Sequence, residues 1–154
     1  MTTDTEKLFA DAKTVRLPGV VHNVSITCEV VDKPVLKVVK LVIAGGRDFN
    51  DIDLLNKTLH ELYISKGIVV EDVCGLARGA DNLGMQWAVA NGCKVHEFPA
   101  DWDKFGKSAG YKRNKQMGEF GDEVLVFWDG VSKGTKHMID LAKLLNKPLT
   151  VVKY

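Results

Sequence analysis

Four short motifs rich in glycine, arginine and aspartate are spaced along this chain of 154 residues. They are Gly-Gly-Arg-Asp at 45–48, Gly-Leu-Ala-Arg-Gly-Ala-Asp at 75–81, Ala-Gly-Tyr-Lys-Arg-Asn at 109–114 and Asp-Gly-Val-Ser-Lys-Gly-Thr at 129–135. Three of them directly follow an apolar run, and 109–114 lies in a stretch with helical character. Backbone amides at such turns and arginine side chains bind phosphate, and aspartate binds ribose hydroxyls. The motifs therefore predict a site for a ligand that contains phosphate and ribose.

The first two motifs can be interpreted with or without a ligand. Their glycines would expose amides and allow close approach of a ligand, and their arginines would bind phosphate oxygens. A plain tight turn and surface ion pairs are the structural alternatives. Asp81 is well explained as a helix N-cap, and it could also contact a ribose hydroxyl. The candidate ligand-binding residues in this part are Gly45, Gly46, Arg47, Gly75, Arg78, Gly79 and Asp81.

The last two motifs and one tryptophan complete the candidate site. An arginine fork on a helix matches two phosphate oxygens, although an exposed helix face explains it as well. The loop 129–134 resembles a phosphate-cradling loop but lacks the Walker order, so nucleoside triphosphate hydrolysis of that type is not predicted. A tryptophan in a long connection could stack on a base or anchor a lid. The candidates are Trp102, Arg113, Asn114, Gly130, Ser132, Gly134 and Thr135, with Ser132 or Thr135 as a plain N-cap in the structural alternative.

Alternating strands and helices would bring these motifs to one edge of a sheet. Apolar runs predict strands at 38–44, 68–74, 94–98, 124–128 and 149–153, and apolar residues at helical spacing predict helices at 52–66, 82–90, 109–119 and 138–145. Residues 100–108 are expected to form a longer connection. This order predicts an α/β fold with a parallel sheet of about five strands and helices on both faces. Ligands bind such sheets at the carboxyl ends of the strands.

The N-terminal part differs from the rest. Val24, Ile26, Cys28 and Val30 alternate with polar residues, which predicts a half-buried strand after a turn at Pro18-Gly19. We therefore expect residues 1–37 to form an extension, a strand or hairpin that packs on the sheet or on a partner subunit, and residues 38–154 to form the ligand-binding domain. The extra strand is compatible with a homo-oligomer.

Composition limits the classes of function. The formal net charge of +1 gives no support to a broad nucleic-acid surface. The sequence contains no long apolar run and no basic-then-apolar leader, so we expect a cytoplasmic protein with no membrane association. The spacing of Cys28, Cys74 and Cys93 shows no pairing, and each lies in or beside an apolar run. We therefore expect buried, inert thiols. The four histidines are scattered, so neither a metal site nor a cofactor is indicated.

Several motifs, taken together and in order, resemble one known family. They are Gly-Gly-Arg-Asp-Phe, Gly-x-Ala-Arg-Gly-Ala-Asp, Pro-Ala-Asp-Trp, Gly-Lys-x-Ala-Gly-x-x-Arg-Asn-x-x-Met and Gly-x-Ser-x-Gly-Thr. They resemble the YspA/YpsA-related SLOG family of the superfamily that contains DprA/Smf and LOG proteins, and the resemblance runs from about residue 41 to residue 152. It implies a Rossmann-like domain that binds nucleotides or nucleotide-derived ligands.

The LOG branch of this superfamily also hydrolyses the N-glycosidic bond of nucleotides. It uses a helical arginine and a Gly-Gly-x-Gly-Thr-x-x-Glu motif, and the resemblance places Arg113 and Gly134-Thr135 at the corresponding positions. Met138 stands where that motif has glutamate. Another carboxylate would have to replace it, and the nearest by motif are Asp48, Asp81 and Asp129.

The motifs and the resemblance are compatible with three functions. The first is binding of a nucleotide-type ligand, as a sensor or a sequestering protein. The second is a phosphoribohydrolase-like reaction on a nucleoside 5′-monophosphate, with Asp48 or Asp129 as the catalytic carboxylate. The third, by kinship with DprA, is single-stranded DNA binding, which the near-neutral charge and the few exposed-looking aromatic residues argue against.

Overall fold

The computed structural model describes residues 14–15, 24–25 and 36–154, and the contacts divide the chain into two units, Met1–Val35 and Leu36–Tyr154. In the first unit, β1 (Thr14–Val15) pairs antiparallel with β2 (Val24–Ser25). The predicted half-buried strand begins at β2, and its residues 26–30 lie outside the described residues.

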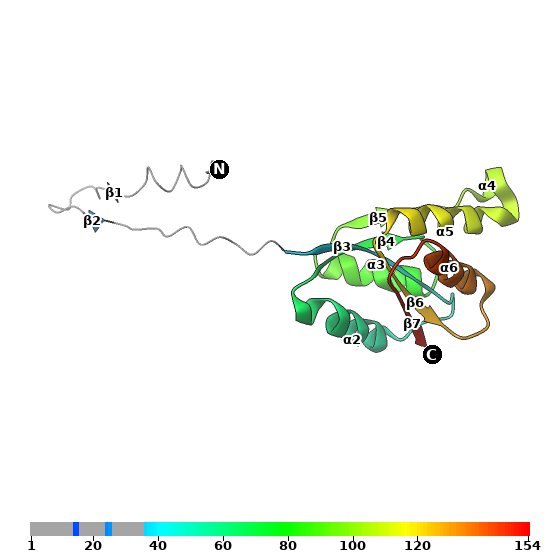
Figure 1. Cartoon of the computed structure of the whole chain (residues 1–154), viewed down its shortest axis with the longest axis horizontal. Coiled ribbons are helices and arrows are strands. Elements are labelled where there is room, and N and C mark those ends of the chain that lie inside the picture. The colour runs from blue at the N-terminus through cyan, green and yellow to red at the C-terminus, as the bar shows by residue number, and fades with distance from the viewer. Residues whose placement is uncertain (1–13, 16–23, 26–35) are drawn as a thin grey trace. The chain divides into compact units, whose positions relative to one another are not determined.

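A parallel sheet of five strands forms the centre of the second unit (Figure 1). Its order is β5-β4-β3-β6-β7, and every neighbouring pair runs parallel. The strands are β3 (Val38–Gly45), β4 (Val69–Cys74), β5 (Val95–Glu97), β6 (Glu123–Trp128) and β7 (Leu149–Lys153). The predicted fold class is confirmed: a Rossmann-like α/β sheet with helices on both faces.

Two hydrophobic cores, one on each face, explain why the central strands are almost continuously apolar. On β3, Leu41 and Ile43 belong to one core, and Val42 and Ala44 belong to the other. Successive side chains of a strand point to opposite faces, so a strand that is covered on both sides needs apolar residues at every position.

Four longer helices cover the sheet, two on each face (Figure 1). The first core includes residues of α2 (Ile52–Leu62) and α3 (Ala80–Ala90), and the second includes residues of α5 (Ala109–Phe120) and α6 (Lys133–Leu144). Asp51 caps α2: its Oδ1 accepts the Leu54 N–H at 2.9 Å. None of the helices in the described part of the chain has the length and apolar character needed to cross a membrane.

Two connections differ from the sequence prediction. The expected helix 52–66 ends at Leu62 and is followed by the 3-10 turn η1 (Ile64–Lys66), which closes at Gly67. The expected loop 100–108 contains the short helix α4 (Trp102–Phe105) and the 3-10 turn η2 (Gly106–Ser108). A helix of one turn carries no apolar stripe, so periodicity cannot reveal it; its signal is the cap, because Asp101 accepts the Lys104 N–H at 3.1 Å.

Candidate functional site

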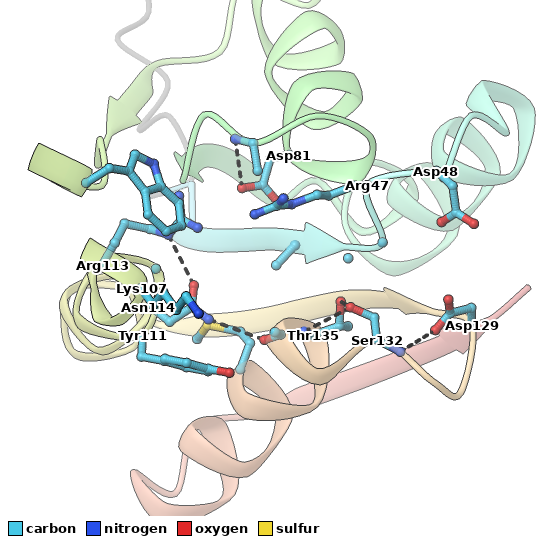
Figure 2. A pocket seen from close by; sticks show the side chains of 18 residues that line it. Arg47, Asp48, Asp81, Lys107, Tyr111, Arg113, Asn114, Asp129, Ser132 and Thr135 are labelled. Carbon is cyan, nitrogen blue, oxygen red and sulfur yellow. Dashed lines mark hydrogen bonds between the residues drawn. The ribbon is translucent and has the colours of Figure 1, made fainter. Parts of the chain in front are cut away.

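A cavity of about 450 Å³ opens at the carboxyl ends of β3 and β6, where the strand order reverses (Figure 2). From β3 the chain builds β4 and β5 on one side and then crosses to β6 and β7 on the other. The loops that follow β3 and β6 therefore leave the sheet in opposite directions and leave a crevice between them. Most of the predicted site residues line this crevice: Gly45, Gly46, Arg47, Asp48, Asp81, Trp102, Arg113, Asn114, Asp129, Ser132, Gly134 and Thr135.

The loop after β3 is packed closely against its neighbours. A Cβ atom on Gly45 would lie 2.3 Å from the Phe127 carbonyl oxygen, so only glycine fits there. Phe49, which ends the Gly-Gly-Arg-Asp-Phe motif, is buried and stacks on Phe127 with ring centroids 4.5 Å apart. Arg47 and Asp48, between these two anchors, are exposed and line the cavity. The first glycine thus serves chain packing, and the two charged residues of the motif line the cavity.

The loop between β4 and α3 lies directly on the loop after β3. The Gly46 carbonyl oxygen accepts hydrogen bonds from Phe49 N–H and Ala80 N–H, both at 3.2 Å. Gly79 has a φ of +78°, and a Cβ atom there would lie 2.1 Å from the Gly46 carbonyl oxygen. Gly79 lines neither this cavity nor the adjoining one described below. It is placed to hold the two loops together.

Asp81 is not the N-cap of α3, contrary to the structural interpretation of the sequence. The helix begins at Ala80 after Gly79, and the buried Asp81 carboxylate accepts the Ala77 N–H within the preceding loop at 3.4 Å. Burial raises the pKa of Asp81 to about 6, against the opposing effect of the nearby Arg113. Figure 2 shows Arg47 pointing toward this carboxylate. Asp81 therefore orders the loop and lies between two arginines.

Arg113 and Asn114 connect three parts of the site from helix α5. Arg113 donates from Nη1 to the Gly75 carbonyl and from Nε to Asn114 Oδ1 at 3.2 Å. Asn114 Nδ2 in turn lies 3.3 Å from the Gly134 carbonyl oxygen, to which it donates. A guanidinium carries five N–H donors, so Arg113 keeps donors for a ligand while these bonds fix its position.

The N-terminus of α6 forms one wall of the cavity. Ser132 is its N-cap: its Oγ accepts the Thr135 N–H at 3.5 Å and the Thr135 hydroxyl at 3.0 Å. The first amides of a helix have no partner within the helix, and the helix dipole places partial positive charge there. This wall is therefore suited to a phosphate or another anion.

Two carboxylates lie together at one end of the cavity, as Figure 2 shows for Asp48 and Asp129. Asp129 Oδ1 accepts the N–H groups of Val131 and Ser132, both at 2.8 Å, and these bonds lower its pKa. Asp48 Oδ1 accepts the Tyr154 hydroxyl at 2.7 Å; desolvation and this neighbour raise the pKa of Tyr154. Both carboxylates thus hold a loop or side chain in place and still face the cavity. Gly130, with φ of +87°, makes the turn after Asp129 and lines neither cavity.

The opposite end of the cavity is cationic and aromatic. Lys107, Tyr111 and Arg113 lie there (Figure 2). Trp102 is 49% exposed and rests on Gly110, where a Cβ atom would lie 3.3 Å from the ring. This end is therefore suited to a flat, anionic ligand.

The sequence prediction did not include Lys107, Gly110, Tyr111 or Met138 among the site residues. Lys107 and Gly110 belong to the Gly-Lys-x-Ala-Gly motif, so that motif was the available signal for them. Met138 is buried and lines the cavity, so the position that carries glutamate in the LOG motif supplies no carboxylate here.

Cys74 has no reactive thiolate. It is buried, as predicted, and burial raises its pKa to about 12 although the Leu76 N–H donates to its sulfur at 3.4 Å. Cys93 is half-buried rather than buried, and Cys28 lies outside the described residues. Across residues 36–154, no three histidine, cysteine or carboxylate side chains gather as metal ligands would.

A second cavity of about 400 Å³ adjoins the first. Gly75 and Arg78 line it, and Arg47, Trp102 and Arg113 line both. Apart from Gly79 and Gly130, the predicted site residues are thus divided between two adjoining cavities.

The sheet order and the crevice at the reversal point define a Rossmann-like α/β domain. Residues 39–105 match the sequence model of the family described as the YspA, cpYpsA-related SLOG family. The chain is also 36% identical over 120 residues to the Gene 61 protein of Mycobacterium phage D29, across 71% of this chain and 93% of that protein. The protein belongs to this SLOG family.

A solved structure shows the same fold. DNA processing protein A (DprA) from Streptococcus pneumoniae superimposes with a TM-score of 0.60 at 17% sequence identity. The superposition covers 74% of this chain and 50% of that chain, so the present protein spans about half the length of DprA.

Proposed function

We propose that the protein binds a nucleotide or a nucleotide-derived ligand in the cavity at the carboxyl edge of the sheet, and acts as a sensor or a sequestering protein. The observation that carries this proposal is the convergence of Arg113 and the α6 N-terminus on one crevice at the reversal point. The sheet does not need two phosphate-binding groups directed at one space in order to fold, so their convergence points to a ligand. Membership of the SLOG family supports the same proposal.

Each wall has a role in this proposal. The amides at the start of α6 and the Arg113 guanidinium bind the phosphate. The base stacks on the exposed ring of Trp102. At the far end, the carboxylates of Asp48 and Asp129 accept hydrogen bonds from sugar hydroxyls or from amino groups of the base.

The first experiment combines titration with chemical identification. The purified protein is incubated with nucleoside monophosphates, dinucleotides and cyclic nucleotides, and both the retained and the released small molecules are identified by mass spectrometry. We expect one nucleotide to be retained intact. Retention of none of them would contradict the proposal.

Variants locate the binding. Arg113→Gln should lower the affinity for the retained nucleotide about tenfold or more, because one charge-assisted contact contributes about 1.5–3 kcal/mol. Trp102→Ala, which removes an exposed side chain, should weaken it with little effect on folding. Lys115→Gln is the matched control, because Lys115 is an exposed residue of α5 and lines neither cavity. Equal binding by Arg113→Gln and Lys115→Gln would place the ligand elsewhere.

Hydrolysis of an N-glycosidic bond is the second candidate, favoured by the two carboxylates that face the same cavity. In this reaction water attacks C1′, the C1′–N bond breaks, and the base leaves with a proton, so one carboxylate activates water or stabilises the developing positive charge. Asp48→Asn and Asp129→Asn keep an acceptor oxygen for the Tyr154 hydroxyl and for the loop amides. Release of free base that both variants abolish would establish this candidate. Intact recovery of the nucleotide would exclude it.

A further inference from the structure

The second cavity is the part of the site that binding of one phosphate leaves unused. The loop of residues 75–78 lines one side of it, and Pro99, Ala100 and Trp102 line another. Arg47, Ala77, Trp102 and Arg113 line both cavities, so one ligand can enter both spaces.

The two cavities differ in charge. The first is lined by Arg47, Lys107 and Arg113 and also by three aspartates, so its formal charges balance. The second is lined by Arg47, Arg78 and Arg113, and none of its lining residues in the described part of the chain is acidic. Three guanidinium groups around one space repel one another, and an anion placed between them relieves that repulsion.

The geometry of the arginines supports a specific role for Arg78. Arg113 is anchored by the Gly75 carbonyl, and Arg47 points toward Asp81 (Figure 2). Arg78 is exposed, and within the described residues no hydrogen bond or ion pair engages its side chain. Its guanidinium is therefore free to bind a ligand, and it lines the second cavity alone, whereas Arg47 and Arg113 line both.

We propose that the second cavity binds a second phosphate of the same ligand, so that the ligand is a nucleotide with two phosphate groups rather than a nucleoside monophosphate. This inference rests on the proposed function, because the first cavity must hold the nucleoside and one phosphate. Trp102 lies at the junction of the two spaces, and Arg47 and Arg113 contact both phosphates. Arg78 contacts only the second.

The test compares pairs of ligands that differ by one phosphate. Nucleoside 5′-monophosphates, 5′-diphosphates and 3′,5′-bisphosphates of the four common bases are titrated into the full-length protein by calorimetry, together with inorganic phosphate and pyrophosphate. We expect a ligand with two phosphates to bind about tenfold or more tightly than its monophosphate. The better of the diphosphate and the bisphosphate identifies where on the nucleoside the second phosphate stands.

Arg78→Gln isolates the second cavity. The variant should bind the monophosphate as the wild type does and should lose the advantage of the second phosphate to within about twofold. Lys104→Gln is the control for nonspecific charge, because Lys104 is exposed and lies over the Phe105 ring, outside both cavities. The Arg78→Gln change removes an exposed side chain, so it should leave the fold intact.

The outcomes separate this inference from the proposed function. If monophosphates bind and a second phosphate adds nothing, the inference is overturned and the proposed function stands. If no nucleotide binds, the proposed function fails and this inference fails with it, even where pyrophosphate binds in a manner that depends on Arg78. Equal weakening of all ligands by Arg78→Gln, an equal effect of Lys104→Gln, or no binding of any ligand overturns the inference.

Discussion

Asp72 is the most unusual residue of the core. It lies on β4 with no exposed surface, and neither of its carboxylate oxygens has a hydrogen-bond partner in the described part of the chain. Burial, together with the nearby Asp81, raises its pKa from 3.8 to about 7. A buried carboxylate without a partner is costly when it is ionised, so this residue makes stability depend on pH.

Stability should therefore fall as the pH rises toward neutrality. Between pH 4 and pH 7 the native state keeps a proton on Asp72 that the unfolded chain has already released, so a rise in pH favours unfolding. At about 1.4 kcal/mol per pKa unit, this carboxyl alone lowers the free energy of unfolding by about 2–3 kcal/mol between pH 5 and pH 7.5. The elevated pKa of Asp81 acts in the same direction. Urea unfolding at the two pH values measures the change.

Asp72→Asn should remove much of this dependence. The difference in free energy of unfolding between Asp72→Asn and the wild type should shift in favour of the variant between pH 5 and pH 7.5, because the amide has no proton to lose. Glu61→Gln, a change at an exposed residue of α2, serves as the control. A pH profile of Asp72→Asn parallel to that of the wild type would contradict the assignment.

For single residues of the site, the sequence predicts the position along the sheet but not the hydrogen-bond partner. Residue types near the ends of strands are sufficient to predict that Arg47 and Asp129 lie at one edge of the sheet, because the edge follows from the alternation of strands and helices. The partner of each side chain did not follow. The sequence pattern favours Asp81 as a helix cap, yet its carboxylate accepts a bond from the loop before the helix, because the N-cap is Gly79 and the helix begins two residues earlier than a cap at Asp81 would give.

At the scale of elements, the contact between two loops positions the site. Gly79 lies on the Gly46 carbonyl, and the Ala80 N–H donates to the same oxygen. These contacts hold the loop after β3 against the loop after β4. They therefore set the positions of Arg47 and Asp81, and any change that separates the loops should affect both cavities.

Gly79→Ala should separate them. The new methyl group would lie 2.1 Å from a carbonyl oxygen on a backbone with φ of +78°. Gly67→Ala is a matched control, because Gly67 has φ of +70° with nothing within 4 Å of the added atom. The control should cost about 1 kcal/mol from backbone conformation alone, and Gly79→Ala should cost at least about 2 kcal/mol more because the loops must move. Thermal unfolding of both variants tests this, and equal losses would show that the loop contact is unimportant.

Helix positions were easier to predict than helix orientation. Apolar spacing located α5 within a residue at its C-terminal end, since Phe120 follows the predicted end at 119. The spacing could not show that Tyr111 faces the cavity, because the rotation of α5 is set by the packing of Ala109 and Met117 against the rest of the fold. Sequence predicts which elements exist, and tertiary contacts decide which face each one presents.

At the scale of the molecule, the site depends on the direction of chain crossovers. β3 and β6 are neighbours although two complete βα units and α2 separate them in sequence, and the cavity lies between their carboxyl ends. The predicted alternation of strands and helices indicates a parallel sheet but leaves its strand order open. The position of the reversal, and with it the grouping of the motifs after β3 and β6, therefore required the three-dimensional structure.

Both hydrophobic cores and all residues that line the two cavities belong to the unit Leu36–Tyr154. A chain that begins at Leu36 keeps the backbone bond from Val69 N–H to the Lys37 carbonyl at the start of the sheet. We therefore propose that this unit is an independent domain. It should unfold cooperatively, at a midpoint temperature within a few degrees of that of the 154-residue chain, and bind the same nucleotide with the same affinity.

Thermal unfolding and calorimetric titration of the shortened and the 154-residue proteins test this prediction, and sedimentation compares their oligomeric states. A large loss of stability or affinity would show that residues 1–35 take part in the fold or the site, and a change confined to oligomeric state would assign them to subunit assembly.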